Sequence, residues 1–252
     1  MDAPAPSPLS VSLAGLPRAR SPRVWIEWAS GLRYRGVALD ATAPGVRPRD
    51  LDRGGRRELT ALLRRSELLL AGVDLFIPPE HFVDPRRVDR ALAAVSAALG
   101  LVADLRGITT RAPTVTIELP AEADTVLDTL AEAALATGVG VADACFPLRE
   151  LGVDGEAVIP ALDPAAALLT GADPVEALAG AGPGAVALRL SDALAGARTP
   201  VGAGALNVGA YRVLTALGGA GRPIVTDLRG VSGWDAAARA AQAAWADAGD
   251  ST

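Results

Sequence analysis

Three apolar runs in the C-terminal part of the chain decide the fold: AVIPALD (157–163), AVALRLS (185–191) and PIVTDL (223–228). Each is rich in aliphatic or β-branched residues, as strands are, and carries a polar residue at or near its end. Segments with helical periodicity, Pro174–Ala181 and Val208–Leu217, separate these runs. Strands that alternate with helices pair in parallel, because each helix returns the chain to the start of the next strand. This part of the chain therefore predicts a parallel α/β fold.

The same alternation runs through the rest of the chain. Five further strand-like runs are SVSL (10–13), GVALDA (36–41), LAGVDLFI (70–77), TVTIELP (114–120) and VGVADA (139–144). The other predicted helices are Arg23–Ser30, Arg49–Arg65, Pro85–Arg106, Glu122–Thr137 and Trp234–Ala246, and Pro147–Glu156 is a weak fifth helix or a loop. Eight such units in 252 residues are typical of a (β/α)8 TIM barrel. An open doubly wound sheet is disfavoured, because no G-x-G-x-x-G turn follows the first strand.

The chain is predicted to form one domain. Residues 10–248 make up the TIM barrel, 1–9 form a proline-rich disordered lead-in, and 249–252 form a tail. An aspartate followed by proline is typical of a helix start, and this pattern occurs at Asp84–Pro85 and Asp173–Pro174. Tryptophans on the first and last helices predict that these helices pack together where the barrel closes: Trp25, Trp28, Trp234 and Trp245.

Composition limits the function and its location. A formal net charge of -5 provides no overall positive field for a nucleic-acid backbone, so no nucleic-acid partner is expected. No apolar run approaches the roughly 20 residues that cross a bilayer, so no membrane is expected. The single Cys145 forms no internal disulfide, and the N-terminus lacks a secretory pattern, which predicts a cytoplasmic protein. All 24 basic residues are arginine, which excludes Schiff-base catalysis by a lysine.

Strand periodicity predicts which side chains face the barrel axis. Large aliphatic residues such as Val73 and Leu75 should face the helices, so residues of the other parity face inward. The inward residues include five acids and one arginine: Asp40, Asp74, Glu118, Asp163, Asp227 and Arg189. Most lie at C-terminal strand ends, where active sites of this fold are built. They form either a structural arginine–carboxylate network or a pocket for a polar ligand.

Five motifs resemble the xylose isomerase-like family of TIM barrels, which includes sugar phosphate isomerases and epimerases. They are SPRVWIEWASGLRYRGVALDAT (21–42), LDPAAALLTGADP (162–174), RLSD (189–192), PVGAGALNV (200–208) and IVTDLRG (224–230). Each motif alone is common, but all five occur in the family's order and spacing. The resemblance implies the barrel fold and chemistry next to a sugar carbonyl, assisted by a divalent cation held by carboxylates and histidines.

The metal ligands of that family are mostly absent from this chain. Alanine or arginine stands at four matching positions: Ala144, Ala166, Arg189 and Ala203. Only Asp163 and Asp227 remain as metal ligands, which would suit magnesium or manganese better than zinc. The three alanines supply no ligand, and the permanently charged guanidinium of Arg189 would repel a cation. Together these four residues disfavour any metal. Our hypothesis is that Arg189 replaces the metal as the positive centre.

The candidate catalytic residues are Glu118, Asp163, Asp227 and His81. Paired acids can move a proton at a carbon next to a carbonyl, and a histidine titrates near neutral pH. His81 can equally be a locally bonded side chain of its loop. Candidate ligand-binding residues are inward or follow a strand: Asp40, Asp74, Glu80, Arg189, Asp192 and Arg229.

Three functions remain open on sequence grounds. The first is a sugar or sugar-phosphate isomerase or epimerase that acts on a small polar ligand. The second is a catalytically retired barrel that binds a small ligand or a protein partner without metal-dependent chemistry. The third, an apurinic-site endonuclease-like barrel, is disfavoured by the single histidine. An open cavity joining the inward acids would favour the first, and closed salt bridges at Arg189 would favour the second. The oligomeric state is left open.

Overall fold

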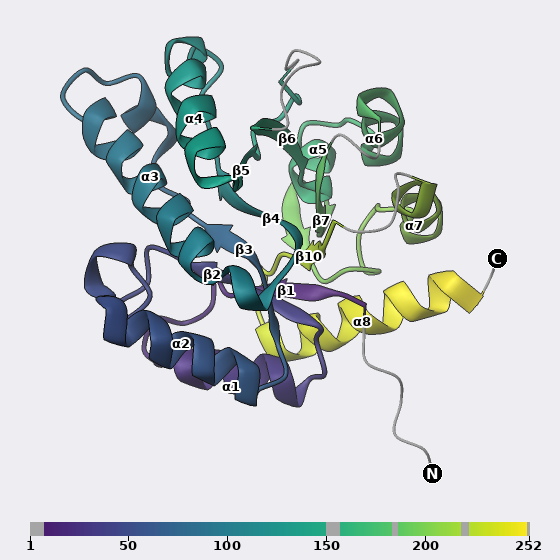
Figure 1. The fold of residues 1–252 in the computed structure, drawn as a ribbon. Coiled ribbons are helices and arrows are strands. Elements are labelled where there is room, and N and C mark those ends of the chain that lie inside the picture. The colour runs from purple at the N-terminus through teal and green to yellow at the C-terminus, as the bar shows by residue number, and fades with distance from the viewer. Residues whose placement is uncertain (1–7, 150–156, 183–185, 218–221, 251–252) are drawn as a thin grey trace.

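Eight parallel strands form a closed barrel in the computed structural model, which describes residues 8–149, 157–182, 186–217 and 222–250 (Figure 1). Around the barrel the order is β1-β10-β7-β6-β5-β4-β3-β2. The strands are β1 Ser10–Ser12, β2 Gly36–Asp40, β3 Leu69–Asp74, β4 Thr109–Ile117, β5 Gly140–Asp143, β6 Val158–Leu162, β7 Ala187–Leu190 and β10 Ile224–Thr226. Each overlaps a predicted strand, which confirms the single (β/α)8 barrel.

Helices surround the barrel, as Figure 1 shows. They are α1 Pro22–Gly31, α2 Arg53–Arg65, α3 Val88–Asp104, α4 Asp124–Thr137, α5 Pro164–Leu169, α6 Pro174–Ala181, α7 Val208–Leu217 and α8 Trp234–Asp250. Short 3-10 turns are η1 Pro48–Asp50, η2 Pro79–Phe82 and η3 Arg106–Ile108. The sequence did not predict α5 or the small antiparallel hairpin of β8 (Asp192–Leu194) and β9 (Ala197–Thr199). The weak helix predicted within Pro147–Glu156 lies largely outside the described residues.

Element ends depart from prediction at a few places. Asp173 caps α6 as predicted, since its side chain accepts a hydrogen bond from the Val175 backbone N–H at 2.7 Å. The cap predicted at Asp84 is wrong: its side chain holds a separate turn by accepting from the Arg86 N–H, and α3 begins later. Leu9 is completely buried, so the core begins one residue before the predicted boundary, and α8 extends into the predicted tail.

The barrel has an aliphatic outer layer and a small-residue interior. Outward residues such as Val37, Leu39 and Val73 belong to one large core between strands and helices. Inward positions carry small residues instead, including Ala38 and Ala71, which form a separate small cluster with Val225, and Ala142 and Ala161, which form another with Ile159. Small inward side chains leave room at the axis for long polar ones, which the strand parity places there.

The first and last helices close the barrel through three tryptophans. The rings of Trp25, Trp28 and Trp234 meet edge to face, with centroids 4.7 to 5.8 Å apart. The Trp28 indole N–H donates to Asp235 at 2.8 Å. This confirms the predicted packing, except that Trp245 faces Arg212 on α7. No helix among the described residues is long and apolar enough to span a membrane.

Candidate functional site

Arg189 lies at the centre of the barrel and is 3% exposed. It is on β7 between two leucines that face the helices, which turns its side chain toward the axis. One guanidinium nitrogen donates to Asp227 Oδ2 at 2.9 Å, and the other donates to Asp74 at the end of β3. The Ser12 hydroxyl at the end of β1 donates to the second oxygen of Asp74. Arg189 therefore ties together strands on different sides of the barrel.

Two further arginines close this network at the carboxyl-terminal end of the barrel. Arg229 Nη2 lies 2.9 Å from Asp163 Oδ2 and 2.7 Å from Asp227 Oδ2. Arg198, from the hairpin, donates to the same oxygen of Asp163, whose other oxygen accepts from the Ser191 hydroxyl. We call the set Asp74, Asp163, Asp227, Arg189, Arg198 and Arg229 the central network. Its three carboxylates and three guanidinium groups have no net charge.

Phe76 packs against the central network just beyond β3. The guanidinium carbon of Arg229 lies 3.7 Å from the ring centroid, and that of Arg189 lies 5.2 Å from it. A cation over an aromatic face is attracted by the ring's negative π-surface, and more strongly where water is excluded. The Phe76 ring thus shields the arginines from solvent on one side.

The surroundings of Asp227 keep it ionised. Burial alone would raise the pKa of this carboxyl, but the adjacent Arg229 and Arg189 outweigh burial and hold its pKa well below the usual range. The same pairings raise the pKa of both arginines despite their burial. At neutral pH, all three groups are therefore charged, and their charges are matched within the network.

A pH titration should detect this depressed pKa. Because Asp227 binds protons less readily folded than unfolded, its stabilising contribution is complete above the unfolded pKa of about 3.9. It is lost as the pH falls toward the lower folded pKa. We expect the free energy of unfolding to drop between roughly pH 5 and pH 2, by at most about 1.4 kcal/mol per pH unit from this group. Urea titrations at several pH values measure it.

The matched variants for that titration are Asp227→Asn and Asp128→Asn, since Asp128 is exposed on α4. The Asp227 variant should lose less stability on acidification than the wild type, whereas the Asp128 variant should follow the wild type. Identical acid profiles for all three proteins would show that Asp227 is not preferentially ionised in the folded state.

The central network does not fit a divalent metal. Guanidinium N–H groups already occupy Oδ2 of both Asp163 and Asp227, the two predicted ligands, and the Ser191 hydroxyl occupies Oδ1 of Asp163. Arg198 Nη1 is buried in the network without a hydrogen-bond partner among the described residues, and this nitrogen is a donor. A cation would need acceptors instead. Within the described ranges, no three His, Cys, Asp or Glu side chains are grouped as a metal site.

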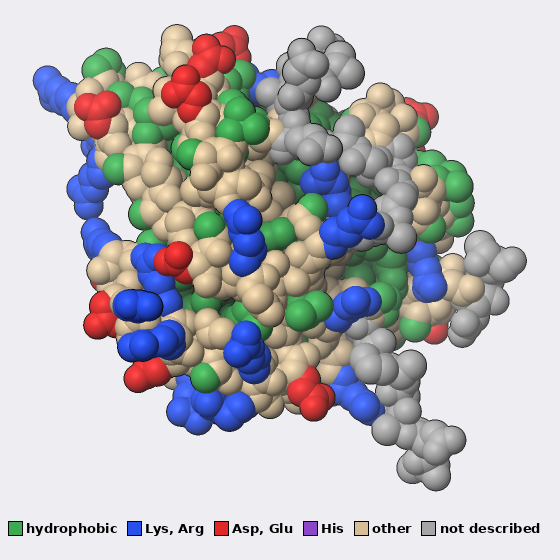
Figure 2. Space-filling view, in the orientation of Figure 1, with side chains coloured by type: hydrophobic (Ala, Val, Ile, Leu, Met, Phe, Trp, Pro, Cys, Tyr) green, Lys and Arg blue, Asp and Glu red, His purple; other side chains and the backbone are tan. Residues whose placement is uncertain are grey.

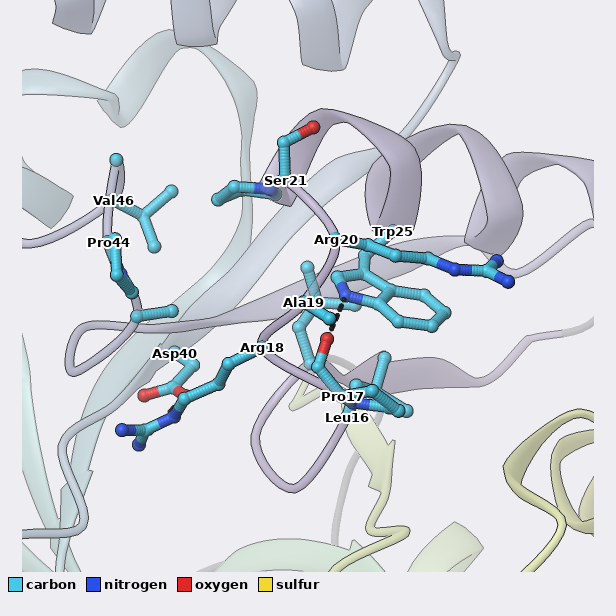
Figure 3. Close-up of a pocket in the computed structure, with 14 residues that line it drawn as sticks. Leu16, Pro17, Arg18, Ala19, Arg20, Ser21, Trp25, Asp40, Pro44 and Val46 are labelled. Carbon is cyan, nitrogen blue, oxygen red and sulfur yellow. Dashed lines mark hydrogen bonds and ion pairs between the residues drawn. The ribbon is translucent and has the colours of Figure 1, made fainter.

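Asp40 lies apart from the central network, beside a cavity of about 380 Å³ (Figure 3). The loops after β1 and β2 form the walls together with Trp25. Asp40 Oδ1 accepts from the backbone and hydroxyl of Thr42, and Oδ2 lies 3.8 Å from the Arg18 guanidinium. Arg20 lies over the Trp25 ring at 5.3 Å. The cavity thus offers a carboxylate oxygen, a guanidinium and a largely apolar wall.

The other predicted residues lie outside the central network. Glu118, half-buried directly after β4, has no hydrogen-bond or ion-pair partner among the described residues. His81 and the exposed Glu80 are in η2, where His81 Nε2 lies 2.7 Å from Arg87 Nη1. Because an arginine only donates, that nitrogen of His81 accepts, and neither residue contacts the acids at the axis.

Asp192 holds the loop after the hairpin. Its two oxygens accept from four backbone N–H groups at 2.9 to 3.0 Å, those of Ala193, Gly202, Gly204 and Leu206. It is 1% exposed. We therefore interpret Asp192 as a residue that positions the loop, since both of its carboxylate oxygens are bonded to backbone N–H groups.

Sequence reasoning missed several polar residues that the fold brings into play. Arg198 is on a three-residue strand that carries no periodic signal, whereas Ser12, at the end of β1, could have been found by strand parity.

Asp143 lies at the end of β5 on the outward side, where it is completely buried and accepts hydrogen bonds from Arg149 and Cys145. Burial and the Asp143 charge raise the pKa of the Cys145 thiol to about 12, so a nucleophilic thiolate is disfavoured.

Comparison with known proteins identifies the architecture. No family model and no curated protein matches the sequence. A xylose isomerase-like TIM barrel protein from Mycobacterium smegmatis in complex with magnesium matches in structure, with a TM-score of 0.72, 14% identity and 97% of each chain covered. The 3-keto-D-glucoside 4-epimerase of E. coli has a TM-score of 0.71 and 13% identity, over 97% of this chain and 99% of that chain.

A third structural match is the probable 3-DHS dehydratase AsbF of Bacillus anthracis, with a TM-score of 0.67 and 13% identity over 93% of this chain and 97% of that chain. Such low identities establish architecture and leave chemistry to the residues of the site. The chain has the fold of the xylose isomerase-like TIM barrels, as its motifs predicted.

Proposed function

We propose that this protein binds a small polar ligand of the carbohydrate type at the carboxyl-terminal face of its barrel, without a divalent metal at the barrel centre. The observation that carries the proposal is the central network, in which Arg198 and Arg229 engage Asp163 while Arg189 and Arg229 engage Asp227. These are the two acids that the family resemblance assigns to the metal. Arginine charge takes the place of the cation, in agreement with a retired metal centre.

The cavity beside Asp40 is the proposed ligand site. Its volume of about 380 Å³ lies within the usual range for small-molecule sites. Asp40 and Arg18 offer an acceptor and donors for hydroxyl groups, and Pro17, Pro22 and Pro44 line an apolar part of the wall, as a sugar with polar edges and apolar faces requires. Structural neighbours that include sugar epimerases support a carbohydrate as the ligand.

A second candidate function, proton transfer on a carbohydrate, is based on Glu118, which is not among the residues that line the Asp40 cavity. It is the one predicted catalytic carboxylate that has no partner among the described residues, so its basic oxygens are available. A half-buried carboxylate can accept a proton from a carbon next to a carbonyl. Glu118 would then be the base of an isomerase or epimerase that works without metal assistance.

Thermal-shift measurements test the binding proposal. A ligand that binds only the native state raises the Tm, by an amount that grows with its concentration relative to Kd. We expect a neutral sugar or a sugar phosphate to raise the Tm of the wild type and of Asp50→Asn, but much less that of Asp40→Asn. Asp50 lies on η1, and its side chain is more exposed. Magnesium and manganese should produce no shift.

Two results would overturn the proposal: no shift with any carbohydrate, or stoichiometric metal in the purified protein that is lost in Asp163→Ala. For a sugar that does bind, incubation in deuterated water separates the two functions. Deuterium entering at carbon in the wild type but not in Glu118→Gln supports proton transfer. Binding without deuterium uptake supports a retired barrel.

A further inference from the structure

A second, strongly basic groove lies between the β2–α2 loop and the start of α3. Its volume is about 650 Å³. Six arginines line it: Arg18, Arg47, Arg49, Arg86, Arg87 and Arg90. No aspartate or glutamate is among its lining residues. Figure 2 shows basic side chains spread over this face of the molecule, including its left edge and lower left, although the whole chain has a net charge of -5.

Half of this positive charge is balanced by neighbouring acids. Three of the arginines are paired, at 3.3 to 3.8 Å: Arg18 with Asp40, Arg49 with Asp50, and Arg87 with Asp84. The other three have no acidic partner among the described residues. Three unbalanced guanidinium groups therefore face one groove.

Those three unbalanced arginines lie on opposite walls. Arg47, from the β2–α2 loop, is fixed by donating through Nε to the Thr42 carbonyl at 2.8 Å, which leaves its other nitrogens available. Arg86 precedes α3 and Arg90 is in its first turn; both are exposed, and neither guanidinium group has a hydrogen-bond or ion-pair partner among the described residues. Guanidinium groups pair with phosphate or carboxylate oxygens through parallel N–H donors. An anionic group in the groove could be contacted from both sides.

The floor of the groove is apolar, with Ile77, Ala91 and Ala94 among its residues. Such a surface suits the carbon skeleton of a small molecule, and the volume is within the usual range for one. We propose that this groove binds a small polyanion of the diphosphate or bisphosphate class. This site is distinct from the proposed carbohydrate cavity and does not depend on it, although Arg18 lies between the two.

Calorimetric titration with inorganic pyrophosphate tests the site. The wild type should bind it more tightly than inorganic phosphate. In Arg86→Gln/Arg90→Gln the Kd should rise by about tenfold for each guanidinium removed, hence about a hundredfold. Both side chains are exposed and unpaired within the described chain, so the variant should retain its fold, which circular dichroism and the Tm verify.

The matched control is Arg65→Gln/Arg111→Gln, which removes the same charge from exposed arginines at the end of α2 and the start of β4, on the opposite face of the barrel. It should bind pyrophosphate like the wild type. An equal loss of pyrophosphate affinity in both double variants would show that only overall charge matters, which would contradict the proposed site. Absence of pyrophosphate binding would overturn it too, as would tighter binding of a single-stranded oligonucleotide, which would assign the groove to nucleic acid. None of these outcomes tests the binding of a neutral sugar in the Asp40 cavity, so the two proposals can fail independently.

Discussion

Arg189→Met is expected to lower the free energy of unfolding by about 3–5 kcal/mol, because removing one partner of a buried ion pair leaves uncompensated charge in the interior. Asp74 would lose its arginine and keep only the Ser12 hydroxyl, while Asp227 would keep Arg229. Methionine fills the volume of the aliphatic part of the arginine side chain. The loss of stability is therefore due to the missing charge more than to lost packing. Denaturant titrations measure it, provided that the m-value is unchanged.

The control is Arg239→Met, which removes an arginine whose side chain is 65% exposed and pairs with Asp235 within α8. Exposed pairs contribute about 1 kcal/mol or less, so this variant should remain close to the wild type. Adding Asp74→Asn to Arg189→Met should restore part of the loss by removing the stranded carboxylate. A loss below about 1 kcal/mol for Arg189→Met alone would show that the central network does not stabilise the barrel.

Strand parity made the centre of the barrel predictable. It assigned inward positions to Asp74, Asp163, Arg189 and Asp227, and the structure places all four in one network. The assignment works because each barrel strand must present large aliphatic residues to the helices. The opposite parity is then fixed by the geometry of the strand itself.

Loop conformation was not predictable in the same way. Arg198 and Arg229 reach Asp163 from segments without strand or helix periodicity, so their partners depend on how the loops fold back over the barrel. The sequence could not show that Glu118 is left without a partner. Nor could it show the basic groove, whose arginines come from three separate segments of the chain, around Arg18, Arg47 and Arg86.

Asp192→Asn is the second substitution expected to have a large effect, about 2–4 kcal/mol of unfolding free energy. The Asp192 carboxylate acts only as an acceptor, and each of its oxygens accepts hydrogen bonds from two backbone N–H groups. An asparagine keeps one accepting oxygen and turns an NH2 group toward the other two backbone donors. Each buried donor left without an acceptor costs about 1–3 kcal/mol, although partial rearrangement reduces the sum.

The loop itself explains why rearrangement is limited. A side-chain carbon added at Gly204 would collide with the Asp192 carboxylate, so the backbone lies directly against this acid. Gly204→Ala should therefore destabilise the protein by the same route as Asp192→Asn, and the two effects should be less than additive, because both break the same contacts. Gly180→Ala provides the control, because Gly180 has open space around it and, like Gly204, lacks a left-handed φ. If Asp192→Asn unfolds at the same denaturant concentration as the wild type, the four N–H bonds do not hold the loop, and the ligand-binding role predicted for Asp192 regains support.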